Sequence, residues 1–343
     1  MKNNRRSFLK KLTAGGAASL MGGGIFPDIA GAAPEKSRVA FAAGTDRRDL
    51  MAEVLKPFRR EIERGIRGKR ILIKPNNVWH GNPLCATHPD AIRGMLDFLK
   101  PLTDMPIEVG ESTASPEGTG YTFEEYGYTP LEREYNVSLV DLNTRPSKTE
   151  WIFGADGCPL NIEIIDSFLD PDTYIISLAR MKTHNCVVAT LAMKNVVMAS
   201  PLNVHKDHPS FVSNQYEKAK MHQGGIPGIN YNMFLIANRV RPHFSVIDGF
   251  EGMEGNGPNN GTPVEHGVAL AGLDVVAVDR IGIELMGIDY ADVGYLQWCS
   301  NAGYGQGDIT KIDVQGPAIR DHVISYRLHD NIEWQMGWKK TEG

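Results

Sequence analysis

The segment 175–200 constrains the fold of this chain most strongly. It begins with an apolar run that predicts a buried strand, continues through a polar turn at 180–185, and ends in a mainly apolar stretch at 187–199 that predicts a helix. In open α/β sheets, ligands bind where strands end and helices begin, because the two kinds of terminus meet in one crevice. The polar side chains that we expect to converge there are Lys182, His184, Lys194 and Asn195.

The same order of strand and helix recurs along the chain. Strands are predicted at 38–43, 70–74, 107–109, 137–142, 151–153, 161–165, 243–247, 268–273, 311–314 and 322–328, and helices at 49–64, 87–99, 226–240 and 274–286. This alternation predicts an α/β fold with a doubly wound, mostly parallel sheet and helices on both faces. We expect one domain over 34–330, with a small cap or sheet extension around 114–165, and a C-terminal tail at 331–343.

The first 33 residues predict a twin-arginine signal peptide. Arg5 and Arg6 precede a Gly/Ala-rich, weakly apolar middle and a small-residue end, with cleavage expected after Ala32 or Ala33. The alternative, a retained membrane anchor, is disfavoured because the apolar stretch is glycine-rich and shorter than the roughly 20 residues that span a bilayer. We therefore expect a periplasmic or extracellular protein, with the twin-arginine export machinery as a partner and no stable membrane span after cleavage.

The export route also bears on cofactors. Twin-arginine substrates are exported folded, often around a cofactor, so a metal or organic cofactor is suspected. The four cysteines, Cys85, Cys158, Cys186 and Cys299, have no ferredoxin-type spacing and are interpreted as small buried thiols, although up to two disulfides are allowed in an exported protein. Removing residues 1–32 takes away five basic residues and one acidic residue from totals of 36 and 41. The resulting charge of about −9 argues against a nucleic-acid surface.

The candidate catalytic residues are two lysines and a histidine. Lys182 and His184 could share a pocket, in which the histidine moves a proton and the lysine neutralises an anion; alternatively, they only cap the strand end. Lys194 lies among apolar neighbours, where a buried ammonium is unfavourable unless it meets an anion. The alternative for Lys194 is that its amino group extends to the surface.

Further residues are candidates for ligand binding. Lys74 and Asn76 lie at the end of a predicted buried strand, which is equally consistent with recognition of a phosphate or carboxylate and with a simple Pro-Asn turn that exposes the lysine. His88 either caps a helix, the favoured interpretation, or ligates a metal. The glycine-rich segment 248–258 is predicted to be a loop whose acids hold a cation or whose backbone approaches a phosphate; the alternative is a tight surface turn. The full candidate set is Lys74, Asn76, His88, Asn195, Asp248, Glu254 and Asp279.

Two further histidines suggest a metal site of their own. His205 and His208 lie beside Asp207 in the long polar connector 201–228 and have metal-ligand spacing if that segment is helical. The alternative is that they are ordinary surface histidines. A connector of this length usually belongs to a site or a lid.

Several short motifs carry a family resemblance. They are Lys74-Pro75-Asn76, Thr87-His88-Pro89, Gly110-Glu111-Ser112, Lys182-Thr183-His184, Lys194-Asn195, Asp248-Gly249, Glu254-Gly255, Gly257-Pro258 and Val278-Asp279. In this order they resemble the domain-of-unknown-function family 362, over about residues 38–317. Many members of that family look like iron–sulfur proteins with an added ferredoxin-type segment, which this chain lacks, so the resemblance does not imply electron transfer here.

A fainter resemblance is to the nickel-dependent lactate racemase family, carried by Lys182-Thr183-His184 and Lys194. The residues after His184 are apolar where that family is glycine-rich, so the nickel cofactor is not carried over. Together, the residues and resemblances predict an enzyme that acts on a small anionic substrate by proton transfer, assisted by a metal or organic cofactor. The alternative is a non-catalytic periplasmic binding or cofactor-handling protein, including an iron–sulfur-associated redox partner. The oligomeric state stays open.

Overall fold

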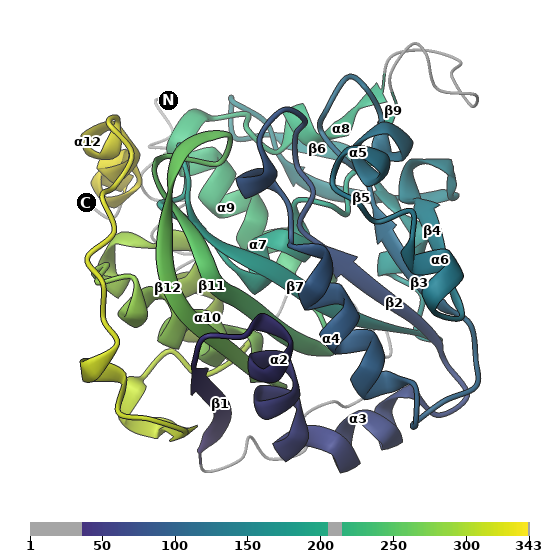
Figure 1. Cartoon of the computed structure of the whole chain (residues 1–343). Helices are drawn as coiled ribbons and strands as arrows, with labels where there is room; N and C mark the ends of the chain where they lie inside the picture. The colour runs from purple at the N-terminus through teal and green to yellow at the C-terminus, as the bar shows by residue number, and fades with distance from the viewer. Residues whose placement is uncertain (1–35, 205–214, 342–343) are drawn as a thin grey trace, which may run out of the picture. The chain divides into compact units, whose positions relative to one another are not determined.

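The main sheet of the protein is mostly parallel. The computed structural model describes residues 36–204 and 215–341 (Figure 1). The strand order is β13-β1-β12-β11-β7-β2-β3-β4, with the short β8 paired to β7. On this path only β12 runs antiparallel to its neighbours. The strands are β1 (Ser37–Ala43), β2 (Arg70–Pro75), β3 (Ile107–Glu111), β4 (Val137–Asp141), β7 (Thr173–Thr183), β8 (Ala189–Thr190), β11 (Phe244–Asn256), β12 (Asn260–Gly272) and β13 (Ile312–Gln315).

Helices cover both faces of this sheet (Figure 1). Because side chains alternate along a strand, β7 supplies Ile175 and Ala179 to one core cluster and Ile176 and Leu178 to the other. The second cluster packs against α2 (Arg47–Leu55), α3 (Arg59–Ile66) and α4 (Pro89–Leu99). The first packs against α7 (Ala192–Val197), α9 (Gly225–Ala237), α10 (Val275–Leu285) and α11 (Gly294–Asn301). The predicted α/β class, with a mostly parallel sheet and helices on both faces, is therefore confirmed.

Smaller elements surround the sheet. The strands β5 (Ser147–Phe153) and β6 (Pro159–Ile165) pair with each other in a separate two-stranded sheet, whereas β4 extends the main sheet. Within the described residues, no helix has both the length and the apolar character needed to cross a bilayer. Cys85, Cys186 and Cys299 are buried and Cys158 is exposed. The remaining elements are α5 (Thr119–Glu125), α6 (Leu131–Glu134), β9 (Asn203–Val204), β10 (Gln215–Tyr216), α8 (Glu217–Lys220) and α12 (Ile332–Gln335).

The central segment differs from its prediction. The predicted polar turn at 180–185 is wrong at its start, because β7 continues to Thr183. Arg180 pairs with Asp248 of β11, and Lys182 pairs with Thr190 of β8. These extra partners keep the charged residues in the strand. The predicted helix at 187–199 is shortened to α7, because residues 189–190 form the strand β8.

The glycine-rich segment 248–258 was also predicted wrongly as a loop. Residues 248–256 of this segment form the C-terminal part of β11. They pair with β12 in a hairpin, where Gly255 lies opposite Gly261. Its glycines permit close backbone approach, since a Cβ at Gly257 would collide with the carbonyl of Thr183. The predicted closing strand at 322–328 is wrong as well, because that segment contacts the hairpin without forming a strand.

Candidate functional site

A cavity of about 220 Å³ lies at the carboxyl ends of β2, β3 and β7, the edge at which ligands bind in α/β sheets. It brings together five of the predicted site residues: Lys74, Asn76, His184, Lys194 and Asn195. The other polar lining residues are Glu111, Ser112, Asn185, Thr190, Lys218, His222 and Asn259. The apolar lining residues are Val78, Trp79, Ala114, Met198, Ala199 and Pro258.

The first of these residues, Lys74, is a paired cation. Its Nζ donates to Glu111 Oε2 at 2.7 Å and to Asn195 Oδ1 at 3.0 Å. Both charged side chains are nearly inaccessible to solvent, at 1% and 4% exposure. Burial lowers the pKa of Lys74, and the Glu111 carboxylate opposes this shift. Lys74 therefore has its charge balanced by Glu111 and fixes the amide of Asn195.

Asp279 holds the helix that carries Lys194. Its Oδ1 accepts a hydrogen bond from Ala192 N at 2.8 Å, and its Oδ2 accepts one from Met193 N at 2.9 Å. It thereby satisfies the free N–H groups at the start of α7. Burial raises the pKa of Asp279 to about 7, and the two backbone hydrogen bonds oppose that rise. The predicted ligand residue Asp279 thus lies behind the cavity and orients α7.

Lys194 differs from the other two lysines of the cavity in its hydrogen bonding. Its side chain is buried, with the residue 6% exposed, and it has no hydrogen bond or ion pair within the described part of the chain. Burial lowers the pKa of Lys194 to about 7, and repulsion from Lys182, Lys218 and Lys74 adds to this shift. A large part of the population therefore has a neutral amine at neutral pH.

His184 presents a neutral imidazole. Its Nδ1 accepts a hydrogen bond from Cys186 N at 3.0 Å, which leaves Nε2 as the protonated ring nitrogen. Burial lowers the pKa of His184 well below its usual value, and the positive charge of Lys194 lowers it further. His222 is similar, since burial and then Lys194 lower its pKa. His184 is therefore a hydrogen-bond donor at neutral pH.

The turn that contains His184 is held by the C-terminal segment. Gln335 donates from Nε2 to His184 O at 2.8 Å and accepts from Val188 N at 2.7 Å. Val188 has a positive φ of 67°, an unfavourable conformation for a β-branched residue. Gln335 lies in the predicted tail and gave no sequence signal for this role, because its contacts are about 150 residues away along the chain.

Lys218 was missed by the sequence prediction. Its Nζ donates to Ser112 Oγ at 2.9 Å and to Met198 O at 2.8 Å, and burial lowers its pKa to about 7. A single lysine in the polar connector has no distinctive pattern, so only the folded structure reveals its position. With Lys74 and Lys194 it makes three lysines around a cavity in which Glu111 is the only carboxylate among the described lining residues.

Two buried polar atoms of the lining lack a hydrogen-bond partner within the structure. They are Asn76 Oδ1 and Thr190 Oγ1. An unsatisfied buried polar atom is unfavourable by about 1–3 kcal/mol, so native proteins usually pair such groups with protein, water or ligand. Both atoms line the same cavity, where a water molecule or a polar ligand can pair with them.

Other predicted residues lie outside this lining. Lys182 donates to Cys85 O at 3.3 Å, and burial lowers its pKa to about 8. Asp248 lies 3.2 Å from Arg47 in an ion pair. Glu254 accepts from Arg327 N at 2.9 Å in the β11–β12 hairpin. His88 accepts from Asp90 N at 3.1 Å and so caps α4, as its favoured interpretation predicted.

The predicted metal ligands His205 and His208 lie outside the described residues. Among the residues that are described, no group of three His, Cys, Asp or Glu side chains has metal-binding geometry.

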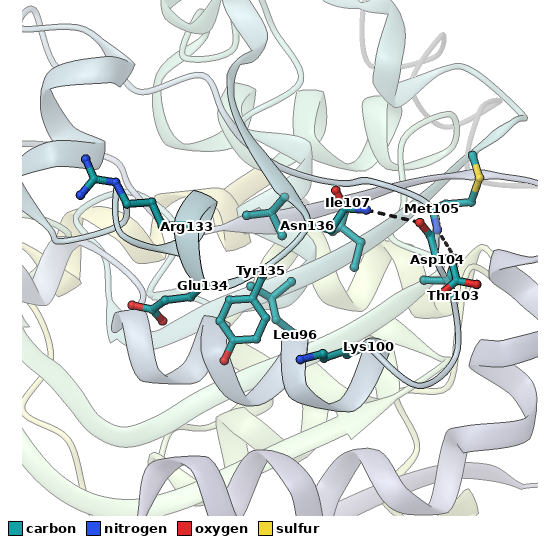
Figure 2. Close-up of a pocket in the computed structure, with 11 residues that line it drawn as sticks. Leu96, Lys100, Thr103, Asp104, Met105, Ile107, Arg133, Glu134, Tyr135 and Asn136 are labelled. Carbon is teal, nitrogen blue, oxygen red and sulfur yellow. Dashed lines mark hydrogen bonds between the residues drawn. The ribbon is translucent and has the colours of Figure 1, made fainter.

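A second cavity, of about 310 Å³, lies elsewhere (Figure 2). It is lined by the end of α4, by 103–107 and by 133–137, close to where β3 and β4 begin. Figure 2 shows its mixed charges, with Lys100 and Arg133 alongside Glu134 and Asp104. None of the predicted site residues that the structure describes lines it, and it lies at the amino ends of these strands. The first cavity is therefore the candidate site.

The fold and the first cavity define an α/β protein with a basic cavity at the carboxyl edge of its sheet. The chain belongs to the family described as Domain of unknown function (DUF362), whose model matches residues 71–284. The family resemblance seen in the motifs is thereby confirmed. A relative from Synechocystis sp., the thylakoid-associated protein sll1697, is 26% identical over 232 residues. That match covers 66% of this chain and 65% of the relative, slightly less than two thirds of its length.

Two solved structures are also similar. A Thermotoga maritima protein from a structural genomics consortium has a TM-score of 0.39 and 10% identity, covering 65% of this chain and 55% of that chain. The lactate racemase apoprotein from Thermoanaerobacterium thermosaccharolyticum has a TM-score of 0.35 and 12% identity, covering 65% and 52%. At these TM-scores, neither likeness bears on function.

Proposed function

We propose that the protein is an enzyme that binds a small anionic substrate in this cavity and transfers a proton on it. The observation that carries the proposal is Lys194, a buried lysine with no partner among the described residues, which lines the same cavity as the paired lysines Lys74 and Lys218. A buried charge needs an opposite charge nearby. An anionic ligand would supply it.

The cavity also suggests the kind of anion. Its volume of about 220 Å³ suits a small molecule more than a large cofactor. Lys218 and the protonated form of Lys194 would bind the anionic group, and Asn76 and Thr190 would bind its polar substituents. Trp79 and Met198 would contact an apolar portion.

Proton transfer is assigned to the side chains of the cavity. As a neutral amine, Lys194 can act as the general base that accepts the proton. His184 can donate a hydrogen bond from Nε2 to an oxygen of the substrate. The nickel chemistry of the lactate racemase family is not part of this proposal, because the described donors do not form a three-ligand site. The cofactor expected from the export signal stays a prediction.

Anion binding and hydrogen exchange would test the proposal. Phosphate, propionate and pyruvate should be titrated calorimetrically into the wild type, K194M, H184A and a K56M control, which changes an exposed lysine. Transfer of solvent deuterium into the methyl group of pyruvate and into the C2 methylene of propionate should then be followed by NMR. We expect K194M to lose at least tenfold in anion affinity, and H184A to lose exchange more than affinity.

The outcomes separate an enzyme from a binding protein. Tight anion binding with no exchange in the wild type would favour the non-catalytic alternative. Equal anion affinity in the wild type and K194M would refute the cavity as the anion site.

We also propose that the protein is exported, with its function in the periplasm or outside the cell. The support is the Arg5-Arg6 motif of the sequence, which lies outside the described residues. Changing both arginines to lysine should leave the chain in the cytoplasm, as measured by cell fractionation. N-terminal sequencing of the exported wild type should begin at Ala33 or Pro34; an unprocessed N-terminus would contradict cleavage.

A further inference from the structure

We propose that Lys194 is a nucleophile that forms an imine with a small aldehyde or ketone carrying a carboxylate or phosphate group. The inference rests on the proposed anion cavity and narrows its substrate class to anionic carbonyl compounds. It depends on three features of the cavity: a lysine with a free amino group, a donor for the carbonyl oxygen, and cations for the anionic group.

The free amino group distinguishes Lys194 from its neighbours. Lys74 Nζ is occupied by Glu111, Asn195 and the carbonyl of Pro75. Lys218 Nζ donates hydrogen bonds to Ser112 Oγ and to the carbonyls of Met198 and Ala199. Of the cavity lysines in the described chain, Lys194 alone makes no such contact. Its nitrogen can therefore approach a substrate without first breaking a protein hydrogen bond.

The backbone beneath Lys194 is held rigidly. Asp279 caps the start of α7, and the neighbouring Asn195 donates from Nδ2 to Lys74 O at 2.9 Å and to Ser177 Oγ at 3.0 Å. These contacts fix both sides of the lysine in the helix. A nucleophile held on a fixed backbone needs less reorganisation to reach its reacting position.

The surroundings of Lys194 also favour nucleophilic chemistry. Only the neutral amine has the lone pair that attacks a carbonyl. Burial, together with the positive charges of Lys182 and Lys218, holds the pKa of Lys194 near 7. Desolvation and a neighbouring cation are the two conditions that activate lysines for imine formation.

The other groups suit the rest of the substrate. His184 Nε2–H can donate to the carbonyl oxygen, since Nδ1 already accepts from Cys186 N. Lys218 provides positive charge for the carboxylate or phosphate. The geometry thus offers separate partners for the carbonyl and the anionic group of one small molecule.

The proposed step is balanced without an oxidant or reductant. The Lys194 Nζ lone pair attacks the carbonyl carbon, the π electrons move to oxygen, and a proton passes from nitrogen to oxygen to give a carbinolamine. The C–O bond then breaks, the second amine proton leaves with the oxygen, and water departs as C=N forms. The imine withdraws electrons from the adjacent carbon, which makes its C–H bond more acidic and connects this step to the proposed proton transfer.

Reductive trapping would test the inference. The full chain should be incubated with pyruvate or glycolaldehyde phosphate and sodium cyanoborohydride, and the modified lysines should be located by peptide mass spectrometry over time. Acetone is the matched ketone without a charge, and propionate is the matched anion without a ketone. The exposed Lys56 is the internal reference. We expect an anionic carbonyl probe to label Lys194 at least tenfold faster than Lys56, with propionate slowing the reaction and acetone showing no preference.

The variant K194R separates anion binding from imine formation. Arginine keeps the positive charge and forms no imine under these conditions, so K194R should bind propionate but lose preferential labelling of the cavity. Labelling of Lys56 as fast as Lys194, or preferential labelling of Lys218, would overturn the inference. If propionate still binds the wild type in that case, the proposed anion site stands. If neither propionate nor phosphate binds, the proposed function itself fails.

Discussion

Replacing Lys194 with methionine should stabilise the unliganded protein at neutral pH. The two side chains have similar lengths, so methionine can fill the same space in α7 without an amino group. In the native protein this amino group is buried and has no partner among the described residues. K194M therefore removes an unfavourable buried charge and removes no favourable contact.

The size of the effect follows from the pKa of Lys194. Folding lowers this pKa from 10.5 to about 7. At about 1.36 kcal/mol per pKa unit, the protonation difference destabilises the native state by about 4 kcal/mol at pH 7. The unfolded chain binds more protons than the native state between pH 7 and 10.5, so the stability contributed through Lys194 rises with pH in this window. From pH 7 to 9 the rise is about 2 kcal/mol.

Urea denaturation of both proteins at pH 7, 8 and 9 would measure this effect. We expect K194M to be more stable than the wild type at pH 7, by up to about 4 kcal/mol, with the difference shrinking by about 2 kcal/mol at pH 9. Saturating phosphate should stabilise the wild type more than K194M, because the anion compensates the buried ammonium. A K194M protein that is less stable at pH 7, with an unchanged pH dependence, would refute the reasoning.

Three further predictions concern the groups around Lys194. E111Q should lower the free energy of unfolding by about 3–5 kcal/mol in urea denaturation, because it leaves the buried Lys74 without its counter-ion; a loss below 1 kcal/mol would contradict a tightly coupled pair. D279A should lower it by about 1–2 kcal/mol through loss of the α7 cap, and should also weaken phosphate binding in calorimetry. Anion affinity should fall as pH rises from 6 to 9 at constant ionic strength, because Lys194 and Lys218 lose their protons with pKa values of about 7; a flat calorimetric profile would argue against a role for both lysines.

Much of the fold follows from local sequence patterns. The apolar runs before Lys74 and within 175–178 form β2 and β7, and the periodic apolar residues of 87–99 form α4. Parallel strands bring their carboxyl ends to one edge of the sheet, so polar residues that follow them meet. This rule placed Lys74 and His184 at one cavity although they are far apart in the chain.

The wrong predictions at 248–258 and 180–185 arose because local sequence patterns do not show which strands pair with each other. The segment 248–258 has the glycines of a loop, yet β12 lies beside it and supplies its hydrogen-bond partners. Lys182 has the polarity of a turn residue, yet β8 pairs with it and the folded chain buries it. In both places, tertiary contacts override the local preference.

The sequence by itself determined the alternation of strands and helices and the apolar setting of Lys194, because both depend on neighbours within a few residues. Only the tertiary structure decided which charges are neutralised. Glu111 reaches Lys74 across 37 positions, Asp279 reaches Ala192 across 87, and Lys218 reaches Ser112 across 106. The electrostatic state of a buried group is set by all the charges and dipoles near it in space. Within the described part of the chain, Lys194 is the cavity lysine without a partner, because long-range contacts supply partners to Lys74 and Lys218.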